Sequence, residues 1–222
     1  LFADGRVAGV RLRSGEEIAA RCVIIATGGK SVPHTGSTGD GYAWARAAGH
    51  TITPLYPTEV PITSDEPWIV SREVQGLSLR GVRLTVEDGK GKKLAEHEGD
   101  MIFTHFGLSG PAALRCSQFV VRALMDGRGP VTVRIDPMPG RSAEQQAGEW
   151  LAAARTEPRK AVKTIILRHL PDRLIPILLD RAKLDREAPA GGISRGGWLA
   201  LADRCKRLAV SADGTLSLKE AF

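Results

Sequence analysis

Cysteine is scarce in this chain of 222 residues, where only Cys22, Cys116 and Cys205 occur. Three cysteines without a C-x-x-C spacing do not suit a disulfide framework, so we expect a cytoplasmic protein in a reducing compartment. The histidines include no pair at positions i and i+4, which disfavours a zinc site. No stretch approaches the roughly 18 consecutive apolar residues of a membrane-spanning helix, so we predict no membrane contact.

Two familiar phosphate-binding motifs are also absent. A P-loop needs a glycine five positions before its Gly-Lys-Ser, but Ile24 occupies that position ahead of Gly29-Lys30-Ser31. The dinucleotide fingerprint G-x-G-x-x-G does not occur, and Gly36, Gly39 and Gly41 show its reverse spacing. Any nucleotide site in this chain must therefore be of another kind.

Charge of one sign is not concentrated in any block. Lys and Arg total 31 against 25 Asp and Glu, a net charge of +6. The basic residues Arg159, Lys160, Lys163 and Arg168 are typical of a solvated face, because no aromatic residues are interleaved with them as in single-strand binders. We therefore predict no nucleic-acid partner. An apolar content of 42% is that of a soluble globular protein, which leaves both an enzyme and a binding module open.

The stretch Val23–Tyr42 carries the strongest pattern. The β-branched run Val23–Ile25 ends in Ala-Thr-Gly-Gly, and a loop rich in Gly, Ser and Thr then leads to Asp40-Gly41. We expect residues 23–26 to form an interior strand whose carboxyl end faces a ligand, as in open α/β sheets. Glycine lets the backbone approach a ligand closely, and exposed N–H groups suit phosphate. A nucleotide site and a tight connection that merely needs glycine both explain the pattern.

The remaining segments predict an α+β fold. A β-meander is expected before residue 26, followed by a helix that Asp40 caps and that ends near Ala48. Alternating apolar residues predict strands at 82–86, from 93, at 101–104 and at 131–135, in a small antiparallel sheet or barrel. Ser109 is expected to cap a helix over 111–125. Ser142 and Gln145 predict a capping box for the first of four further helices, after which strand-like texture returns at 210–218.

Four motifs together resemble one known family. ATGGKS at 26–31, TGSTGDGY at 35–42, MIFTHFGLSGPAAL at 101–114 and LSLKEAF at 216–222 look like the BaiN-like (YhiN-type) flavoproteins. The resemblance implies an FAD-binding domain of the glutathione-reductase type, interrupted by an insertion with a β-barrel-like part and a helical cluster. It places a partial FAD-binding domain at 1–53, the insertion at 54–208 (β-rich to 140, then helical) and a return to the FAD-binding domain at 209–222.

The resemblance also implies where a flavin site lies. The first glycine turn would lie against FAD, and the second loop would lie close to the flavin or its pyrophosphate. The loop from His105 to Pro111 would reach the substrate side, with His105 and Ser109 as catalytic candidates. A histidine bound by its local backbone and a serine that only caps a helix are the alternatives for these two. The cofactor-binding residues expected from the resemblance are Ala26, Thr27, Gly28, Gly29, Thr35, Gly36, Ser37, Thr38, Gly39 and Asp40.

Members of this family are similar to FAD-dependent dehydrogenases, reductases or amine oxidases. The resemblance therefore implies hydride transfer to or from a small organic substrate, with NAD(P)H as a candidate partner. Such flavoproteins also carry an initial G-x-G-x-x-G turn and a final glycine-rich flavin segment, neither of which occurs between Leu1 and Phe222. We thus expect a fragment that does not hold FAD tightly and is inactive by itself. A non-catalytic module that binds a ligand or partner is the alternative.

Overall fold

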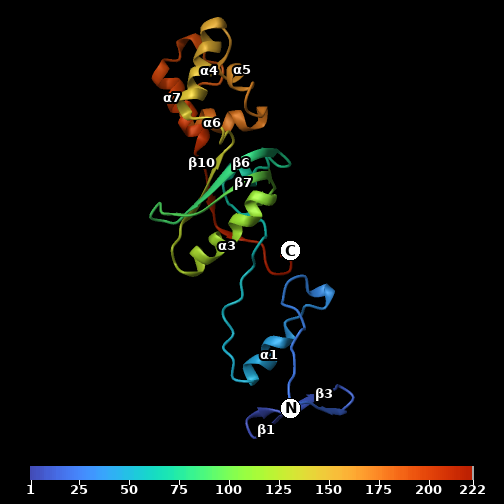
Figure 1. Ribbon diagram of the computed structural model, residues 1–222. Coiled ribbons are helices and arrows are strands. Elements are labelled where there is room, and N and C mark those ends of the chain that lie inside the picture. Colours follow the sequence, from blue (N-terminus) through green and yellow to red (C-terminus); the bar gives the residue numbers. More distant parts are fainter. Residues whose placement is uncertain (222) are drawn as a thin grey trace. The chain divides into compact units, whose positions relative to one another are not determined.

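The computed structural model describes residues 1–221, which divide into an N-terminal unit, Leu1–Pro54, and a C-terminal unit that begins at Leu55 (Figure 1). In the N-terminal unit, β1 (Phe2–Ala3) pairs with β2 (Arg6–Val7), and β3 (Gly9–Arg11) pairs with β4 (Glu17–Ala19). The single β-meander predicted for residues 1–25 is instead two separate two-stranded sheets, because β2 does not pair with β3. A 3₁₀ turn, η1 (Pro33–Thr35), and the helix α1 (Asp40–Ala47) follow.

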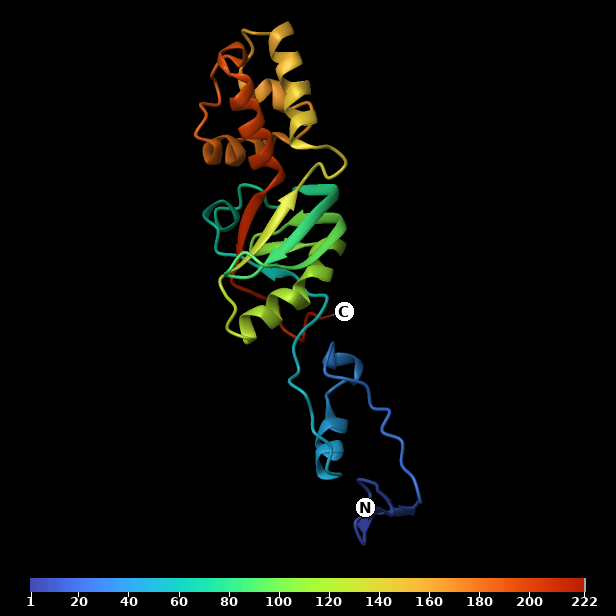
Figure 2. The ribbon, with the colours of Figure 1, turned by 60° about the vertical axis from the view of Figure 1, so that its left-hand side comes forward.

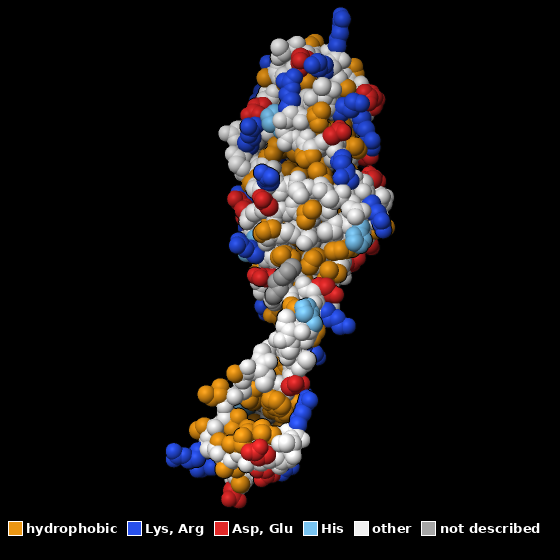
Figure 3. Space-filling model, turned by 90° about the vertical axis from the view of Figure 1, so that its right-hand side faces the viewer, with side chains coloured by type: hydrophobic (Ala, Val, Ile, Leu, Met, Phe, Trp, Pro, Cys, Tyr) orange, Lys and Arg blue, Asp and Glu red, His pale blue; other side chains and the backbone are white. Residues whose placement is uncertain are grey.

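The interior strand predicted at residues 23–26 is not formed. Residues 21–29 belong to no helix or strand, and the side chain of Ile24 is 90% exposed. The prediction was wrong because a run of β-branched residues becomes an interior strand only when strands on both sides accept its backbone hydrogen bonds. Among the described residues, no segment pairs with this one. Figure 3 shows apolar side chains gathered on one face of this unit.

The C-terminal unit is built on a seven-stranded antiparallel sheet in the order β10-β9-β6-β7-β8-β5-β11. Leu84 and Val86 of β6 and Val133 and Ile135 of β9 alternate inward and are completely buried, as their period of two requires. The predicted strands at 93 and 101–104 are one continuous strand. The seven strands are β5 (Ile62–Thr63), β6 (Ser78–Glu87), β7 (Lys93–Phe103), β8 (Gly107–Ser109), β9 (Val131–Asp136), β10 (Leu208–Ala212) and β11 (Gly214–Thr215).

The two edges of this sheet are joined by one residue. β10 lies at one edge and β11 at the other, and only Asp213 separates them in the chain. Because one residue spans about 3.8 Å, the edges lie next to each other and the sheet curls into a barrel. The Asp213 N–H donates to the Thr63 carbonyl oxygen at 3.2 Å, and the Thr63 hydroxyl donates to the Asp213 carboxylate, which fixes this closure. The predicted α+β fold with a barrel-like part is confirmed.

Helix α3 (Pro111–Met125) lies along one face of the sheet, against β6 and β7 (Figure 2). Its inward stripe is made of small residues, including Ala112, Ala113 and Cys116, all with no exposed surface, so the helix backbone comes close to the sheet. A short helix, α2 (Pro67–Val70), covers the barrel near β5 with the buried side chains of Trp68 and Ile69.

A helical cluster is inserted between the neighbouring strands β9 and β10, and stands beyond one end of the sheet (Figure 2). Trp150 and Trp198 are buried at its centre with ring centroids 6.1 Å apart. The capping box predicted from Ser142 and Gln145 is present. The cluster contains α4 (Ala143–Thr156), α5 (Val162–Ile166), η2 (Asp172–Leu174), α6 (Ile175–Ala182), η3 (Ala190–Gly192) and α7 (Arg195–Lys206).

The expected return to the FAD-binding domain at residue 209 falls inside this unit. Leu208, Val210 and Ala212 of β10 face the barrel core, and β10 pairs with β9 over five residues. Residues 208–212 form an edge strand of the barrel. Among residues 1–221, no helix combines the length and apolar character needed to cross a bilayer.

Candidate functional site

The two glycine-rich stretches of the N-terminal unit lie against each other. A Cβ added to Gly28 would lie 2.9 Å from the Ser37 Oγ, and one added to Gly29 would lie 3.5 Å from the Tyr42 hydroxyl. A Cβ on Gly41 would lie 2.6 Å from the Thr27 Oγ1. The fold therefore brings together residues 27–29 and 37–42. From the sequence, only the family resemblance predicted that these two stretches lie at one site.

Glycine is required at these contacts for two reasons. Gly28 has a φ of +74°, a backbone conformation that side chains with a Cβ rarely adopt. Gly41 is one of the two buried residues of the N-terminal unit, and any larger side chain there would push Thr27 and Ile25 away from α1. The turn keeps its shape through glycine rather than through a surrounding core.

The first turn presents backbone donors to solvent. Among the described residues, the N–H groups of residues 26–30 have no hydrogen-bond partner, and all five residues are exposed. The second loop is tied to itself, since Thr35 donates to the Val32 carbonyl from both its N–H and its hydroxyl, and Gly36 donates to the Pro33 carbonyl. Asp40 is the first residue of α1 and does not cap it; Gly39 holds the N-cap position with a φ of +85°.

These residues fit one side of a flavin nucleotide site. Unpaired N–H groups at 26–30 can donate to phosphate or flavin oxygens, and the Ser37 hydroxyl lies next to Gly28. Nothing in the N-terminal unit encloses such a ligand, because its only buried residues are Gly9 and Gly41. The turn can supply contacts to FAD, but the unit supplies no buried cavity around it.

The catalytic candidates lie in the C-terminal unit, His105 in the tight turn between β7 and β8 and Ser109 at the end of β8. The His105 ring is exposed and packs edge-on against Phe106, with centroids 4.8 Å apart. Its ring nitrogens have no hydrogen-bond partner among residues 1–221, which does not support the alternative of a histidine bound by its local backbone. The Thr104 N–H donates to the Gly107 carbonyl and closes the turn at 2.8 Å.

Ser109 belongs to β8, opposite Ile102, and does not cap α3. The cap predicted at Ser109 was wrong by one position, because Gly110 adopts the N-cap with a φ of +90° and leaves Pro111 as the first helical residue. The bounds predicted for this helix are confirmed. His105 thus lies in the turn before β8, and Ser109 is the last residue of that strand.

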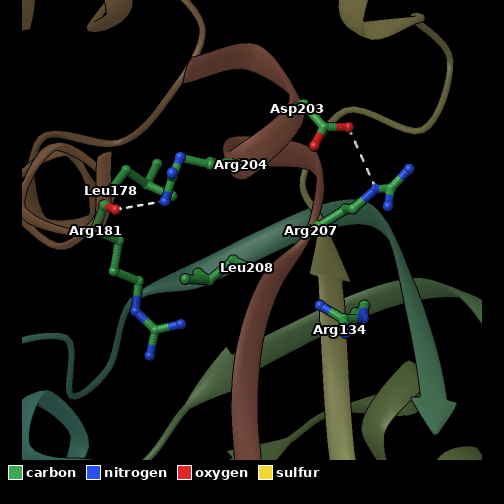
Figure 4. Close-up of a pocket in the computed structure, with 7 residues that line it drawn as sticks. All are labelled: Arg134, Leu178, Arg181, Asp203, Arg204, Arg207 and Leu208. Carbon is green, nitrogen blue, oxygen red and sulfur yellow. Dashed lines mark hydrogen bonds and ion pairs between the residues drawn. The ribbon is translucent and has the colours of Figure 1, made fainter. Parts of the chain in front are cut away.

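Four arginines that sequence reasoning did not single out line a pocket of about 240 Å³ in the C-terminal unit (Figure 4). They come from β9 (Arg134), α6 (Arg181) and the end of α7 (Arg204 and Arg207), and Asp203 is the acidic residue beside them. Leu178 and Leu208, each 1% exposed, complete the lining. Positions so far apart in the chain meet only through the insertion of the helical cluster between β9 and β10, so no local signal could have revealed them.

Comparison with known proteins gives a family match and several relatives. Residues 56–222 match the family described as HI0933-like protein barrel and H2TH domain. The chain is 28% identical to the 3-dehydro-bile acid delta(4,6)-reductase of Clostridium scindens over 206 residues, which cover 90% of this chain and 48% of that protein. It is 30% identical to the ribosomal RNA dihydrouridine synthase of Haemophilus influenzae over 168 residues, 76% of this chain and 38% of that protein.

The corresponding synthase of Escherichia coli is 29% identical over 163 residues, which cover 73% of this chain and 37% of that protein. The chain therefore spans about half, or less, of the length of the curated relatives it matches.

Proposed function

The chain belongs to the HI0933-like family, and from that membership we propose that it is part of a flavin-dependent reductase that saturates a carbon–carbon double bond conjugated to a carbonyl group. The observation that carries this proposal is the chemistry common to the relatives. A 3-dehydro delta(4,6) steroid has double bonds conjugated to its C3 ketone, and dihydrouridine is uridine whose C5=C6 bond, conjugated to the C4 carbonyl, has been reduced. Both names describe one reaction type on different substrates.

FAD is the cofactor that the glycine turn suits. When bound, reduced FAD supplies the hydride that such a reduction needs. Donors at residues 26–30 would hold its oxygens, and the hydroxyls of Ser37 and Thr38 would add to them. NAD(P)H is the proposed source of the electrons, and a small conjugated ketone or an RNA uridine is the proposed substrate.

His105 is the residue proposed to hold the proton that completes the reduction. The His105 ring is exposed, and its two nitrogens have no hydrogen-bond partner in the described part of the chain, so either nitrogen can donate a proton to a bound substrate. Ser109, across the turn, would position the substrate carbonyl through its hydroxyl. The strand that follows His105 lies close against its neighbour, because a Cβ on Gly107 would overlap the carbonyl oxygen of Ile62.

We also propose that this 222-residue chain binds FAD weakly by itself. The donors of the glycine turn are exposed, and the N-terminal unit has no buried side chain to enclose the isoalloxazine ring. Titration of the chain with FAD should give weak binding that Gly41→Ala weakens further, while Ala43→Ser, on the exposed side of the same helix, leaves it unchanged. A chain purified with stoichiometric flavin would contradict weak binding.

The reaction is tested with the product of the complete gene. After anaerobic incubation with FAD and NADPH, it should remove the conjugated absorbance of a 4,6-dien-3-one steroid or convert uridine in RNA to dihydrouridine. His105→Gln should lower the rate of substrate reduction and leave flavin binding unchanged. A colourless gene product, or one that reduces neither substrate, would refute the reductase and favour a non-catalytic binding module.

A further inference from the structure

We propose that the arginine pocket, defined by Arg134, Arg181, Arg204 and Arg207, is a phosphate-binding site that holds the backbone of an RNA strand. Four arginines line the pocket together with a single acidic residue, Asp203. Guanidinium matches the geometry of phosphate oxygens with paired N–H donors, and is the side chain most suited to hold them. This inference rests on the proposed function, which offers a small conjugated ketone or an RNA uridine as the substrate, and it selects the RNA.

The arginines are held in place by groups at the margins of the pocket. Arg134 Nε lies 2.7 Å from a Glu87 carboxylate oxygen, and Arg181 donates to the Ala209 carbonyl at 2.7 Å and to Glu66 at 2.9 Å. Arg204 donates to the Arg181 carbonyl at 2.8 Å (Figure 4). The side chains are therefore positioned before a ligand arrives, which lowers the entropy lost on binding.

Donors remain after these bonds are counted. In the described part of the chain, Arg134 and Arg207 have no partner for either terminal nitrogen, and Arg204 has none for its Nε and Nη2. Glu66 and Glu87 each offset one arginine, so the pocket keeps a modest excess of positive charge. The buried leucines of the lining exclude water from one wall, which strengthens the attraction for an anion.

The lining favours a nucleic-acid backbone over a free nucleotide. None of its seven residues is aromatic, so it offers no surface on which a base can stack. Arg207 is 68% exposed at the rim, which leaves the pocket open to a chain that continues past it. Contacts of this kind position RNA without reading its sequence. The sequence predicted no nucleic-acid partner from the basic residues Arg159, Lys160, Lys163 and Arg168. None of these four residues lines the pocket.

The test is RNA binding by the 222-residue chain, without flavin or NADPH, so that a failed reductase does not decide it. Fluorescence anisotropy of a short labelled single-stranded RNA is followed between about 50 and 200 mM salt. The double variant Arg204→Gln and Arg207→Gln should bind about tenfold more weakly, and its salt slope should fall by about 1.4, the value for two lost phosphate contacts. Both side chains are exposed, so the fold is retained.

Two further variants keep the result specific to the pocket. Arg155→Gln with Arg159→Gln makes the same charge change at exposed positions outside the lining and should leave affinity within about twofold. Asp203→Asn removes the carboxylate beside Arg207 and should tighten binding about threefold. A tighter complex is not expected from a residue that serves only the fold.

Two outcomes overturn the proposal. Equal affinity of the pocket variant and the charge-matched variant would show that the arginines do not contact phosphate. Displacement of RNA by NADPH as readily as by unlabelled RNA, at equal phosphate concentration, would assign the pocket to a nucleotide cofactor instead of RNA.

Discussion

The two units of this chain differ in what holds them together. The C-terminal unit buries one continuous apolar core from the barrel through the helical cluster, whereas the only buried residues of the N-terminal unit are Gly9 and Gly41. Phe2, Ile24 and Trp44 of the N-terminal unit are more than half exposed. Apolar burial is the main source of folding free energy, so the N-terminal unit gains little stability from a core of its own.

The glycine turn and the apolar core that stabilises the chain therefore belong to different units. The candidate flavin contacts stand on the unit that lacks a core, and His105 and the arginine pocket stand on the unit that has one. Variants in the buried core of the C-terminal unit should therefore act through stability, and variants near the glycine turn through ligand binding.

The largest expected effect is in hydrogen exchange. Amides of β6 and β9 are bonded on both sides in the barrel and should exchange only on global unfolding, whereas those of residues 26–30 have no partner among the described residues. With a typical stability of about 5 kcal/mol or more, the two sets should differ by about four orders of magnitude. Mass spectrometry of the 222-residue chain measures both. Slow exchange of the amides of residues 26–30 would contradict the difference between the two units, because it would require a core that the N-terminal unit does not show.

The second effect is a clash inside the barrel. Gly107 has a φ of +152°, and a Cβ there would overlap the Ile62 carbonyl oxygen across the β5–β8 pairing. Gly107→Ala should therefore lower the free energy of unfolding by roughly 3 kcal/mol, the sum of backbone strain and overpacking. Urea denaturation measures the change.

Gly140→Ala is the matched control for that substitution, because nothing lies within 4 Å of the added Cβ and its φ is not positive. It should change the free energy of unfolding by less than about 0.5 kcal/mol. Similar losses in both variants would mean that β5 and β8 do not approach as closely as described.

The sequence predicted those structural features that depend on residues close together in the chain. The capping box at Ser142 and the bounds of α3 follow from side chains within one helical turn, and both are confirmed. Alternation in β6 and β9 predicted strands because each inward residue needs only the same core face. The cap positions at Asp40 and Ser109 were wrong by one residue, since glycine at positive φ replaced the side-chain cap in each case.

The features that the sequence did not predict depend on contacts between residues far apart in the chain. The run Val23–Ile25 has strand composition, but no strand of the described chain pairs with it. The arginine pocket assembles β9, α6 and α7, whose contributions lie up to 73 positions apart in the chain, between Arg134 and Arg207. Closure of the barrel through Asp213 likewise follows from the strand order, which no local pattern determines.

The third effect is a gain of stability in the helical cluster. The Gln146 side chain is completely buried on α4, and neither its amide nitrogen nor its oxygen has a hydrogen-bond partner among the described residues. A buried polar group without a partner costs about 1–3 kcal/mol, so Gln146→Met, of similar volume, should raise the free energy of unfolding by about 1–2 kcal/mol. Gln75→Met, at an exposed position, should change it little. Destabilisation by the buried substitution would show that water or another group bonds the amide.

The smallest effect is a pH dependence confined to the C-terminal unit. Burial lowers the pKa of His169, helped by the nearby Arg141 charge and opposed by Glu149, whose carboxylate lies 3.1 Å from Nε2. Trp150 donates its indole N–H to Nδ1 at 3.1 Å, a bond that only the unprotonated nitrogen accepts. The unfolded chain, with an ordinary histidine pKa of about 6.5, binds the proton more readily. Stability should therefore be complete above that value and decline as pH falls through the lowered folded-state pKa.

His169→Gln removes this titration and keeps an acceptor for Trp150, so its urea midpoint should depend less on pH between about 7.5 and 5 than that of the unchanged chain. His97→Gln removes a histidine of β7, away from the helical cluster, and is the matched control for this substitution. Because Trp150 lies in the cluster core, its fluorescence reports this unit, while Trp44 of the N-terminal unit is 54% exposed and should not follow it. A pH response of Trp44 that His169→Gln abolishes would show that the two units unfold together, and would remove the separation on which the other predictions rest.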